Sequence, residues 1–402
     1  MPDKLPFTFL FDPEFAADPH AMYGPLRELG PVHPIDFPPG TSAFLILDYE
    51  HGRAALNDPR LSKDMLRNGP DWLQEETRIN PVISHHMLVQ DPPDHTRQRR
   101  LVARAFTPRR VEELRPRVAE ITDELIDAMV ARGEADLIAD FAVPLPITVI
   151  CELIGIPVEI RPAFREWSQQ VLMVAVDEEQ RAVQLRAVQG ITDTFTDLIA
   201  SRRAAPREDL VSALIGARDD DGVLSEEEVL GTLVLLMIAG HETTVNLIGS
   251  GMAALLREPA QLRLLRERPE LLPSAVEELL RLESPVERST NRIAVQDLEI
   301  AGTPIPAGSF VHVSLAAASR DPKVFPEPDR LDLAREGNRH IAFGHGVHFC
   351  LGAPLARLEG QIAFGALLSR LPGIALACPP EDLRWSMSGS VTRGLVSLPV
   401  RF

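Results

Sequence analysis

The sequence predicts a mainly α-helical protein with a minor β region. Long stretches carry apolar residues at helical spacing, and the few extended stretches are short and bounded by turns rich in Pro and Gly. The chain has 402 residues, 45% hydrophobic and 25% charged, which is typical of a globular protein. Because it contains no low-complexity linker, internal repeat or long charge run, we expect one domain over residues 1–402.

The expected helices are marked by apolar spacing or by start signals. Apolar residues three and four apart from Val111 onward predict a helix over residues 108–132. Ser225 and Glu228 are spaced as a capping box, so a long helix is expected from there to about residue 257. Similar patterns predict the remaining helices over residues 146–153, 190–202, 259–265 and 273–282.

The expected strands are short, and Pro-Pro-Gly and Pro-Ala-Gly turns separate them from their neighbours. They cover residues 32–34, 43–48, 293–300 and 310–315. These few short strands cannot build a large sheet, so the helices dominate the predicted fold.

Charge and targeting signals favour a cytoplasmic protein. The formal net charge of −17 argues against general binding to nucleic acid. The N-terminus lacks the basic start and apolar core of a signal peptide, and the apolar stretch over about residues 229–240 is too short to span a bilayer. Three cysteines give no disulfide framework and suit a reducing compartment. We therefore expect no membrane anchor.

One cysteine lies in a glycine-rich turn directly before a predicted helix. Residues 343–352 read Phe-Gly-His-Gly-Val-His-Phe-Cys-Leu-Gly, and Pro354 suits the first turn of the helix that follows. The positive end of the helix dipole favours the thiolate of Cys350. Glycines at 344, 346 and 352 leave room for a flat, bulky partner. A thiolate presented in this way is suited to bind a metal.

Two other interpretations of Cys350 stay open at this point. A solitary cysteine is usually a small, buried apolar side chain. Alternatively, His340, His345 and His348 could join Cys350 in a zinc site, although closed zinc sites usually draw on two separated pairs of ligands. The zinc interpretation also leaves the glycines unexplained.

The cysteine turn resembles, at every defining position, the haem-ligand loop of the cytochrome P-450 family. The resemblance extends over nearly the whole chain, from about Phe11 to Phe402. It implies the family's triangular, mainly α haem-thiolate fold and a haem b (iron protoporphyrin IX) with Cys350 as the axial ligand. It also implies that Phe343 and Gly344 lie against that haem.

A second signal lies inside the long predicted helix, in the sequence Ala-Gly-His-Glu-Thr-Thr over residues 239–244. Glycine in a helix costs about 1 kcal/mol relative to alanine. A threonine hydroxyl can bond to a carbonyl one turn back and open the helix locally. Glu242 and Thr243 would then form an acid–alcohol pair for proton delivery.

The alternative for this segment is a buried helix with ordinary polar residues on one face. The segment resembles the family's oxygen-binding helix. That resemblance implies that Thr243 is the oxygen-activating hydroxyl, that Glu242 is its acidic neighbour and that Ala239 contacts the haem.

Two further sets of residues have roles implied by the resemblance. Glu278 and Arg281 lie three apart on one helix face and resemble the family's structural ion pair, with Arg330 as the third member. Such a pattern is weak alone, because many helices contain it. Haem propionates need cationic or hydrogen-bonding partners. The positions that match the family's propionate-binding residues are His95, Arg99, Arg292 and His348.

Arginines crowd the segment around residues 97–110 in an otherwise acidic protein. They are either an ordinary solvated charge run or a docking surface for an acidic electron-transfer protein. The residues concerned are Arg97, Arg100, Arg104, Arg109 and Arg110. The chain has no flavin or nicotinamide domain, so the resemblance implies separate redox partners. These would be a ferredoxin and a ferredoxin reductase that deliver electrons from NAD(P)H.

The substrate is not identified by any motif. By resemblance, the recognition walls include residues 65–89, 164–186 and the turn at 389–391, and their mixture of apolar and scattered polar residues suits a sizeable, largely apolar molecule. The side chains expected to contact it are Leu88, Val89, Ile238, Ala239, Thr243, Val286 and Val391. The motifs most resemble those of actinobacterial enzymes that hydroxylate macrolides, other polyketides, steroids or secosteroids.

Three functions are therefore considered. The first is a haem-thiolate monooxygenase that activates dioxygen and hydroxylates or epoxidises its substrate. The second is a haem-thiolate enzyme with altered chemistry, such as oxidative coupling, dehydration or use of peroxide. The third is a haem protein without catalytic activity that senses or carries a gas. The intact Glu242–Thr243 pair favours the first function over the second.

Overall fold

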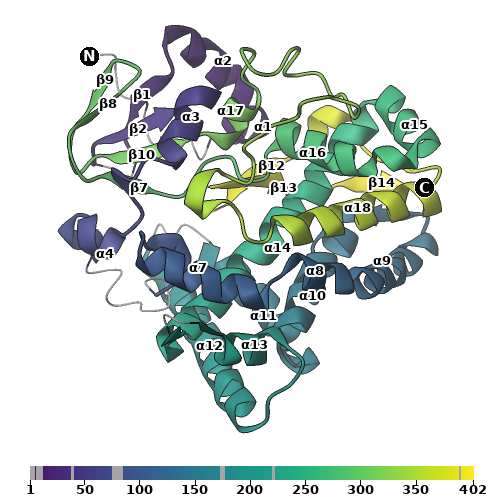
Figure 1. Ribbon diagram of the computed structural model, residues 1–402. Coiled ribbons are helices and arrows are strands. Elements are labelled where there is room, and N and C mark those ends of the chain that lie inside the picture. The colour runs from purple at the N-terminus through teal and green to yellow at the C-terminus, as the bar shows by residue number, and fades with distance from the viewer. Residues whose placement is uncertain are drawn as a thin grey trace. The chain divides into compact units, whose positions relative to one another are not determined.

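A computed structural model describes residues 5, 12–37, 40–74, 85–172, 177–219, 222–388 and 391–402 (Figure 1). The structure is 59% helix and about 12% strand, which confirms the mainly α fold predicted from the sequence. The chain forms two compact units. The first contains Met1–Leu61, Leu114–Leu145 and Glu242–Phe402, and the second contains Ser62–Glu113 and Pro146–His241.

A five-stranded sheet forms one part of the first unit, with the order β1-β2-β10-β7-β3. Its strands are β1 (Val32–Ile35), β2 (Ala43–Ile46), β10 (Phe310–Val313), β7 (Arg292–Ala294) and β3 (Leu61–Ser62). β2 and β10 run parallel, whereas β1 is antiparallel to β2 and β7 is antiparallel to β10. Because β10 is central, its residues are buried on both faces.

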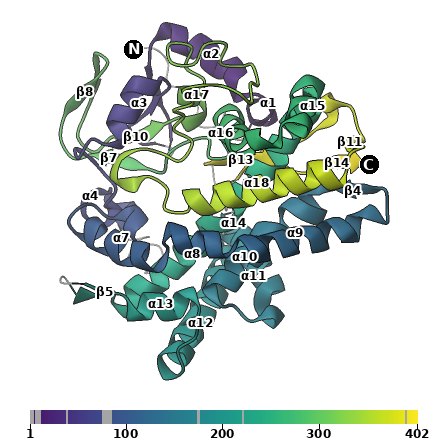
Figure 2. The ribbon, with the colours of Figure 1, turned by 45° about the vertical axis from the view of Figure 1, so that its right-hand side comes forward.

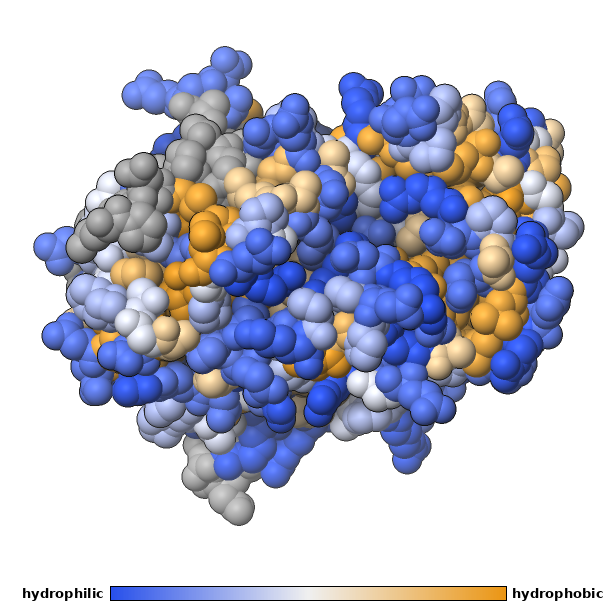
Figure 3. Space-filling model, turned by 90° about the horizontal axis from the view of Figure 1, so that it is seen from above, coloured by the Kyte–Doolittle hydropathy of each residue, from blue (hydrophilic) through white to orange (hydrophobic). Residues whose placement is uncertain are grey.

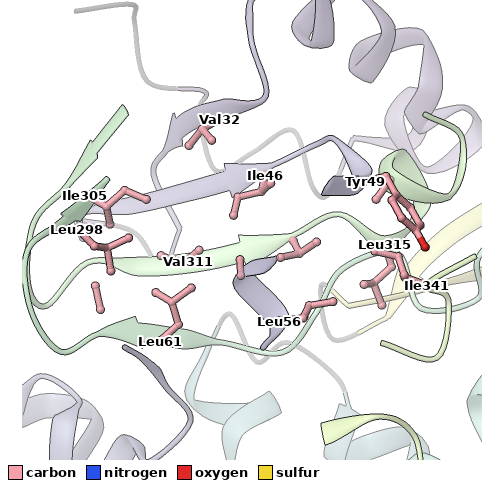
Figure 4. Close-up of a cluster of buried hydrophobic side chains, with 14 of the residues drawn as sticks. Val32, Ile46, Tyr49, Leu56, Leu61, Leu298, Ile305, Val311, Leu315 and Ile341 are labelled. Carbon is pink, nitrogen blue, oxygen red and sulfur yellow. The ribbon is translucent and has the colours of Figure 1, made fainter. Parts of the chain in front are cut away.

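Apolar side chains of the sheet and its neighbouring helices form a continuous core (Figure 4). Ile46 and Val311 come from the paired strands, and Leu56 and Leu315 come from α3 (Tyr49–Leu56) and α17 (Leu315–Ser319). Burial of these side chains fixes the sheet and, with it, the segments that enter and leave β7 and β10.

Long helices complete the first unit. α18 (Ala353–Arg370) packs against α9 (Arg115–Val130) and α16 (Leu272–Glu283) (Figure 2). Gly360 of α18 allows close packing, because an added Cβ would lie 3.3 Å from Leu247 and 3.4 Å from Val276. The other helices of this unit are α1 (Pro13–Ala17), α2 (Pro19–Leu29), α15 (Pro259–Glu267) and the single turns η5 (Pro269–Leu271), η6 (Gly346–His348) and η7 (Pro380–Asp382), with the π-helical turn η3 (Ile138–Ala142).

Small sheets account for the remaining strands of the first unit. β8 (Leu298–Ile300) and β9 (Thr303–Ile305) form one hairpin, and β12 (Trp385–Ser388) and β13 (Thr392–Leu395) form another. A three-stranded sheet has the order β11-β14-β4, with β11 (Ala375–Leu376), β14 (Pro399–Arg401) and β4 (Glu134–Asp136).

The second unit is largely helical. Phe164 and Phe195 pack edge to face between α11 (Arg161–Leu172) and α12 (Glu178–Ala204), and Gly190 of α12 lies close under the ring of Trp167. The other elements are α4 (Met65–Asn68), η2 (Met87–Val89), α7 (Asp94–Ala105), α8 (Pro108–Glu113), η4 (Val158–Ile160), α13 (Leu210–Gly216), β5 (Arg218–Asp219) and β6 (Gly222–Val223). α10 (Pro144–Ile154) and α14 (Glu226–Arg257) each contribute residues to both units.

The predicted helices are found, with different ends. The helix expected over residues 108–132 is divided into α8 and α9 at Leu114, because Pro116 starts a new helix in its first turn. Residues 190–202 lie within the longer α12, while α10, α15 and α16 cover the other three predictions. The capping box is confirmed. The Glu228 amide donates to Ser225 Oγ over 3.2 Å, and the Ser225 amide donates to Glu228 Oε2 over 2.8 Å.

Three of the predicted strands differ from the observed ones, because one is divided and two end earlier than expected. The segment 293–300 belongs to two sheets, β7 and β8, which a turn separates. Residue 48 leaves the strand predicted over 43–48, because the Asp48 side chain accepts a hydrogen bond from His51 and caps α3. In the same way Ser314 caps α17 and ends β10.

α14 is the one described helix that is long and apolar enough to cross a membrane, by length and composition. Within its most apolar window, 67% of the residues are buried inside the protein, as in the core helix of a globular protein. The surface seen from above is dominated by hydrophilic side chains with apolar ones among them (Figure 3). This agrees with the formal net charge of −17.

Candidate functional site

Backbone hydrogen bonds close the loop that carries Cys350. The Cys350 amide donates to the Phe343 carbonyl over 2.9 Å, and the Gly344 amide donates to the Ile341 carbonyl over 2.8 Å. Gly344 and Gly346 have φ angles of 74° and 75°, in the left-handed region that other residues avoid. The fold of the loop therefore requires glycine at both positions.

The two glycines have different surroundings. A Cβ at Gly346 would lie 2.6 Å from Asn57 Oδ1, so Gly346 is needed for packing against the end of α3. A Cβ at Gly344 would meet no atom within 4 Å. This open side of Gly344, together with the exposed thiol of Cys350 just before α18, fits a flat ligand lying on the loop.

A charged and aromatic cluster supports the loop within the first unit. Arg357 of α18 donates two hydrogen bonds to Glu277, over 2.7 and 2.8 Å, and its guanidinium lies 4.6 Å from the centre of the Phe343 ring. His340 Nε2 lies 3.2 Å from the same carboxylate. Burial acts to raise the pKa of Glu277, but the hydrogen bonds from Arg357 and His340 outweigh it and lower that pKa to about 2.

The same cluster carries positive charge close to the thiol. Hydrogen bonds to Glu277 raise the pKa of Arg357, and attraction to Cys350 adds to the effect. Arg357 is therefore a permanent cation that interacts with both Glu277 and Cys350. Such a charge favours the thiolate form of a cysteine.

The zinc interpretation of this region is not supported. Among the residues that the structure describes, no group of three or more His, Cys, Asp and Glu side chains could hold a metal ion. His340 is directed to Glu277, and His345 Nε2 accepts a hydrogen bond from Arg53 over 3.2 Å. A single cysteine such as Cys350 is suited to be the one protein ligand of a metal whose other ligands belong to a cofactor.

One face of α14 is open in its central turns, although most of the helix is buried. Ala239 is exposed, and Ile238, Glu242 and Thr243 are half-buried. Leu235, one turn earlier, is half-buried as well. Positions three and four apart share a helix face, so these residues form one stripe. Three of them, Ile238, Ala239 and Thr243, were predicted to contact oxygen, haem or substrate, and Glu242 was predicted to deliver protons.

The opposite side of the same segment is packed. A Cβ at Gly240 would lie 3.2 Å from Ile150, so this glycine lets α10 approach α14. His241 is buried and satisfied, with Nδ1 2.9 Å from the Met237 carbonyl and Nε2 3.1 Å from Ser168 Oγ. α14 is a continuous α-helix through this segment, so the predicted local opening does not interrupt it.

Glu242 has a side-chain partner that the sequence did not indicate. Thr392 Oγ1 of β13 donates a hydrogen bond to Glu242 Oε1 over 3.0 Å, and both residues belong to the first unit. The carboxylate of the predicted acid–alcohol pair is therefore held by a strand 150 residues away in the sequence.

The predicted propionate partners are divided between the units. In the second unit, His95 is buried on α7, and Arg99 lies one turn further along. Burial and then the charge of Arg99 lower the pKa of His95 to about 4, so this imidazole is neutral at pH 7. In the first unit, the buried Arg292 donates to the Leu61 carbonyl over 3.3 Å, and His348 ends η6 two residues before the cysteine.

Some predicted substrate contacts are brought together. The Glu287 amide, beside Val286, donates to the Val391 carbonyl over 2.8 Å, and Val286 pairs with Thr392 across a β-bridge. Leu88 and Val89 end η2 in the second unit and are half-buried. Parts of the predicted recognition walls, at 75–84, 173–176 and 389–390, lie outside the described residues.

A buried ion pair holds α16, as the sequence predicted. Glu278 and Arg281 have no exposed side-chain surface and are joined by bonds of 2.8 and 2.9 Å. The third member is corrected from Arg330 to Arg335, whose Nε lies 3.1 Å from both Glu278 oxygens. The Arg330 backbone carbonyl accepts a hydrogen bond from Arg281. The Arg330 side chain is 56% exposed and pairs instead with Glu327 and Asp332.

The predicted docking arginines have unequal surroundings. Arg97 is half-buried and pairs with Glu228, so its charge is compensated. Arg109 pairs with Glu113 over 2.9 Å, and Arg110 donates to the Ala105 carbonyl. Arg100 and Arg104 are exposed, and Arg104 donates to the Arg218 carbonyl.

Sequence reasoning missed Glu277, Arg335, Arg357 and Thr392 as members of the site. Arg357 lies seven residues after Cys350, in the second turn of α18, so it is close to the cysteine loop in the sequence. That spacing was the available signal for Arg357. The contacts of the other three residues join segments far apart in the chain and leave no local pattern.

Comparison with known proteins gives matches along the whole chain. The family model for Cytochrome P450 matches residues 167–374. Cytochrome P450 monooxygenase PikC of Streptomyces venezuelae is 50% identical over 392 residues, covering 97% of this chain and 92% of that protein. Mycinamicin IV hydroxylase/epoxidase of Micromonospora griseorubida is 46% identical over 385 residues, covering 94% of each. Among solved structures, "the cytochrome P450 enzyme CxnD for C-S bond formation in chuangxinmycin biosynthesis" has a TM-score of 0.93 at 46% identity, covering 100% of this chain and 98% of that one.

Proposed function

This chain belongs to the cytochrome P450 family and is a monooxygenase, and on that premise we propose that it hydroxylates or epoxidises a macrolide, another polyketide or a steroid-like molecule. The similar Mycinamicin IV hydroxylase/epoxidase supports this substrate class. The observation that carries the proposal is that the first unit contains both an exposed thiol directly before α18 and the half-buried Glu242 and Thr243 on α14. The apolar Ile238, Val286 and Val391 suit a large apolar substrate.

The cofactor of this family is haem, and we propose haem b. Cys350 would supply the thiolate ligand of its iron, and the open side of Gly344 would leave room for it. Arg99 and Arg292 would offset the propionate charges, while the neutral His95, together with His348, would supply hydrogen bonds. A haem bound through thiolate supplies oxygen activation and oxygen transfer to the substrate.

The chain's own residues control the substrate and the protons. Glu242 lies near the surface of the open stripe of α14, where it can exchange protons with solvent, and Thr243 follows it directly. We assign the transfer of protons to Glu242 and their local delivery to the hydroxyl of Thr243. The apolar side chains proposed to contact the substrate exclude water from the site. This limits the release of partly reduced oxygen without formation of product.

Replacing Thr243 with alanine is expected to divert most reducing equivalents to hydrogen peroxide, because the hydroxyl that delivers protons is lost. Product formed per NAD(P)H consumed should fall by about tenfold, while NAD(P)H consumption continues. Thr243→Ser retains the hydroxyl and should keep most of the coupling. If Thr243→Ala couples as well as the unchanged protein, the hydroxyl has no role in proton delivery.

Electrons come from separate redox proteins, and we propose a ferredoxin with a ferredoxin reductase. Arg100 and Arg104 are the most accessible cations of α7 and suit an acidic partner. Arg97 and Arg109 contribute less, because Glu228 and Glu113 compensate their charges.

Changing both Arg100 and Arg104 to glutamate should slow reduction by an acidic ferredoxin roughly tenfold at low salt, and the difference should shrink as salt rises. Stopped-flow reduction at several ionic strengths measures this. The control pair is Arg263→Glu with Arg384→Glu, two exposed arginines on other segments. An equal effect of both pairs, or no effect of the first, contradicts docking on α7.

Labelled dioxygen tests the proposed reaction. With substrate, redox partners and ¹⁸O₂, one labelled oxygen atom is expected in the product. Product without label would favour altered chemistry, for which the similar enzyme CxnD, with its C-S bond formation, provides a precedent. Absence of substrate-dependent NAD(P)H consumption across macrolide, polyketide and steroid libraries would favour a haem protein without catalytic activity.

We also propose that the chain acts as one cytoplasmic domain. Both compact units are assembled from separate chain segments, and α14 contributes residues to both. A cut between units would therefore divide a helix, which argues for a single folding unit.

A further inference from the structure

The hairpin β12–β13 contacts α14 at two points, both within the first unit. At one point Thr392 Oγ1 donates to Glu242 Oε1 over 3.0 Å. At the other, Gly394 lies so close to the buried Asn246 side chain that an added Cβ would overlap Asn246 Oδ1. No side chain other than hydrogen fits at position 394 without moving the helix or the strand.

The two contacts follow from the repeats of the two elements. Thr392 and Gly394 are two residues apart and share one face of β13. Glu242 and Asn246 are four residues apart and share one face of α14. Two strand residues advance about 6.6 Å and four helix residues about 6 Å, so both pairs can meet at once.

The opposite face of β13 is anchored in the core. Arg393, between the two contact residues, pairs with the buried Glu283 over 3.1 Å, and its guanidinium lies 3.8 Å from the centre of the Trp385 ring. Its amide donates to the Pro285 carbonyl over 2.9 Å. These contacts fix the strand, so Thr392 presents its hydroxyl to α14 from a rigid support.

The same hairpin bears a predicted substrate contact. Val391 directly precedes Thr392 and accepts a hydrogen bond from Glu287, while Thr392 pairs with Val286 across a β-bridge. Thr392 is therefore linked on both sides. Its backbone neighbours are the predicted substrate contacts Val286 and Val391, and its hydroxyl donates to the Glu242 carboxylate.

We propose that Thr392 is a positioning residue for Glu242, which holds the carboxylate in the orientation used for proton delivery and ties that orientation to the predicted substrate contacts Val286 and Val391. This inference rests on the proposed proton role of Glu242. Thr392 does not itself transfer the proton. Its hydroxyl is the donor and the carboxylate is the acceptor, so the bond restrains Glu242 through one of its two carboxylate oxygens.

The test compares Thr392→Val, which keeps the shape of the side chain without the hydroxyl, with Thr392→Ser, which keeps the hydroxyl. The fraction of NAD(P)H electrons recovered in product should fall roughly three- to tenfold in Thr392→Val and return in Thr392→Ser. In the Glu242→Gln background, Thr392→Val should cause no further fall, because the two residues act as one unit. Thr196→Val is the matched control, since the exposed Thr196 hydroxyl donates to the Thr192 carbonyl of its own helix.

Crystal structures supply a readout that is independent of turnover. The Glu242 carboxylate should occupy one orientation in the unchanged protein and in Thr392→Ser, and more than one in Thr392→Val. A single, unchanged orientation and full coupling in Thr392→Val would overturn the inference. So would an equal loss of coupling in both backgrounds.

Failure of the proposed function gives a different pattern. In that case Glu242→Gln itself leaves coupling unchanged, or no substrate-dependent electron consumption occurs in the unchanged protein. If Thr392→Val does not fold, its thermal unfolding midpoint and haem content reveal this. Thr392→Ala, tested in the same assays, then replaces it with the same expected results.

Discussion

Replacing Cys350 with alanine is expected to abolish the red-shifted Soret band of the reduced carbon monoxide complex and to reduce coupled turnover to background. The thiolate is the one protein ligand proposed for the haem iron, and its electron donation causes both the spectral shift and the reactivity. Alanine removes the sulfur but leaves the loop hydrogen bonds, because the amide of residue 350 still donates to Phe343.

Cys378→Ala is the matched control for this substitution. Cys378 is partly buried and lies outside the loop. Its replacement should leave the band and the turnover unchanged. Haem content is measured on both variants, so loss of the band is separated from loss of haem. Loss of the red-shifted band in Cys378→Ala, or its retention in Cys350→Ala, contradicts the assignment of the ligand.

Replacing Glu278 with alanine is expected to lower the free energy of unfolding by about 3–5 kcal/mol. Glu278 is fully buried and accepts hydrogen bonds from Arg281, Arg335 and Asn338. Its removal leaves two guanidinium groups in the interior without their carboxylate. The unpaired buried charges destabilise the folded protein by more than the intact ion pair stabilises it.

Denaturant unfolding of the haem-loaded protein measures the loss. Glu327→Ala is the control, because Glu327 pairs with Arg330 at the surface, where removal of an ion pair costs less than about 1 kcal/mol. Arg335→Ala should be more destabilising than Arg330→Ala, since only Arg335 places its side chain on Glu278. If Arg330→Ala and Arg335→Ala lower the free energy of unfolding equally, Arg330 is a partner of the Glu278–Arg281 pair, as the sequence predicted.

Local signals predicted most helices and the cysteine loop. The capping box at Ser225 and Glu228 is a pattern within four residues, and the structure forms both of its hydrogen bonds. The sequence singled out the loop glycines because they leave room for a flat partner, and the structure shows in addition that Gly344 and Gly346 adopt a left-handed φ. The packing role of Gly346 was not evident from the sequence, because Gly346 and Asn57 are far apart in the chain.

Contacts between distant segments account for what the sequence did not predict. Arg330 and Arg335 both lie near the expected position, and only the path of the chain after α17 directs Arg335 to Glu278. The bond between Thr392 and Glu242 depends on how a hairpin seats on a helix. Charge partners are equally non-local, so the pairing of Arg97 with Glu228 could not be seen in the arginine pattern.

X-ray absorption at the iron edge of the purified, haem-loaded protein shows whether the Cys350 sulfur is bound to iron. We expect one sulfur atom bound to iron in the unchanged protein and none in Cys350→Ala. An iron with only nitrogen and oxygen ligands in the unchanged protein, or with a sulfur ligand that persists after Cys350 is replaced, would contradict this expectation.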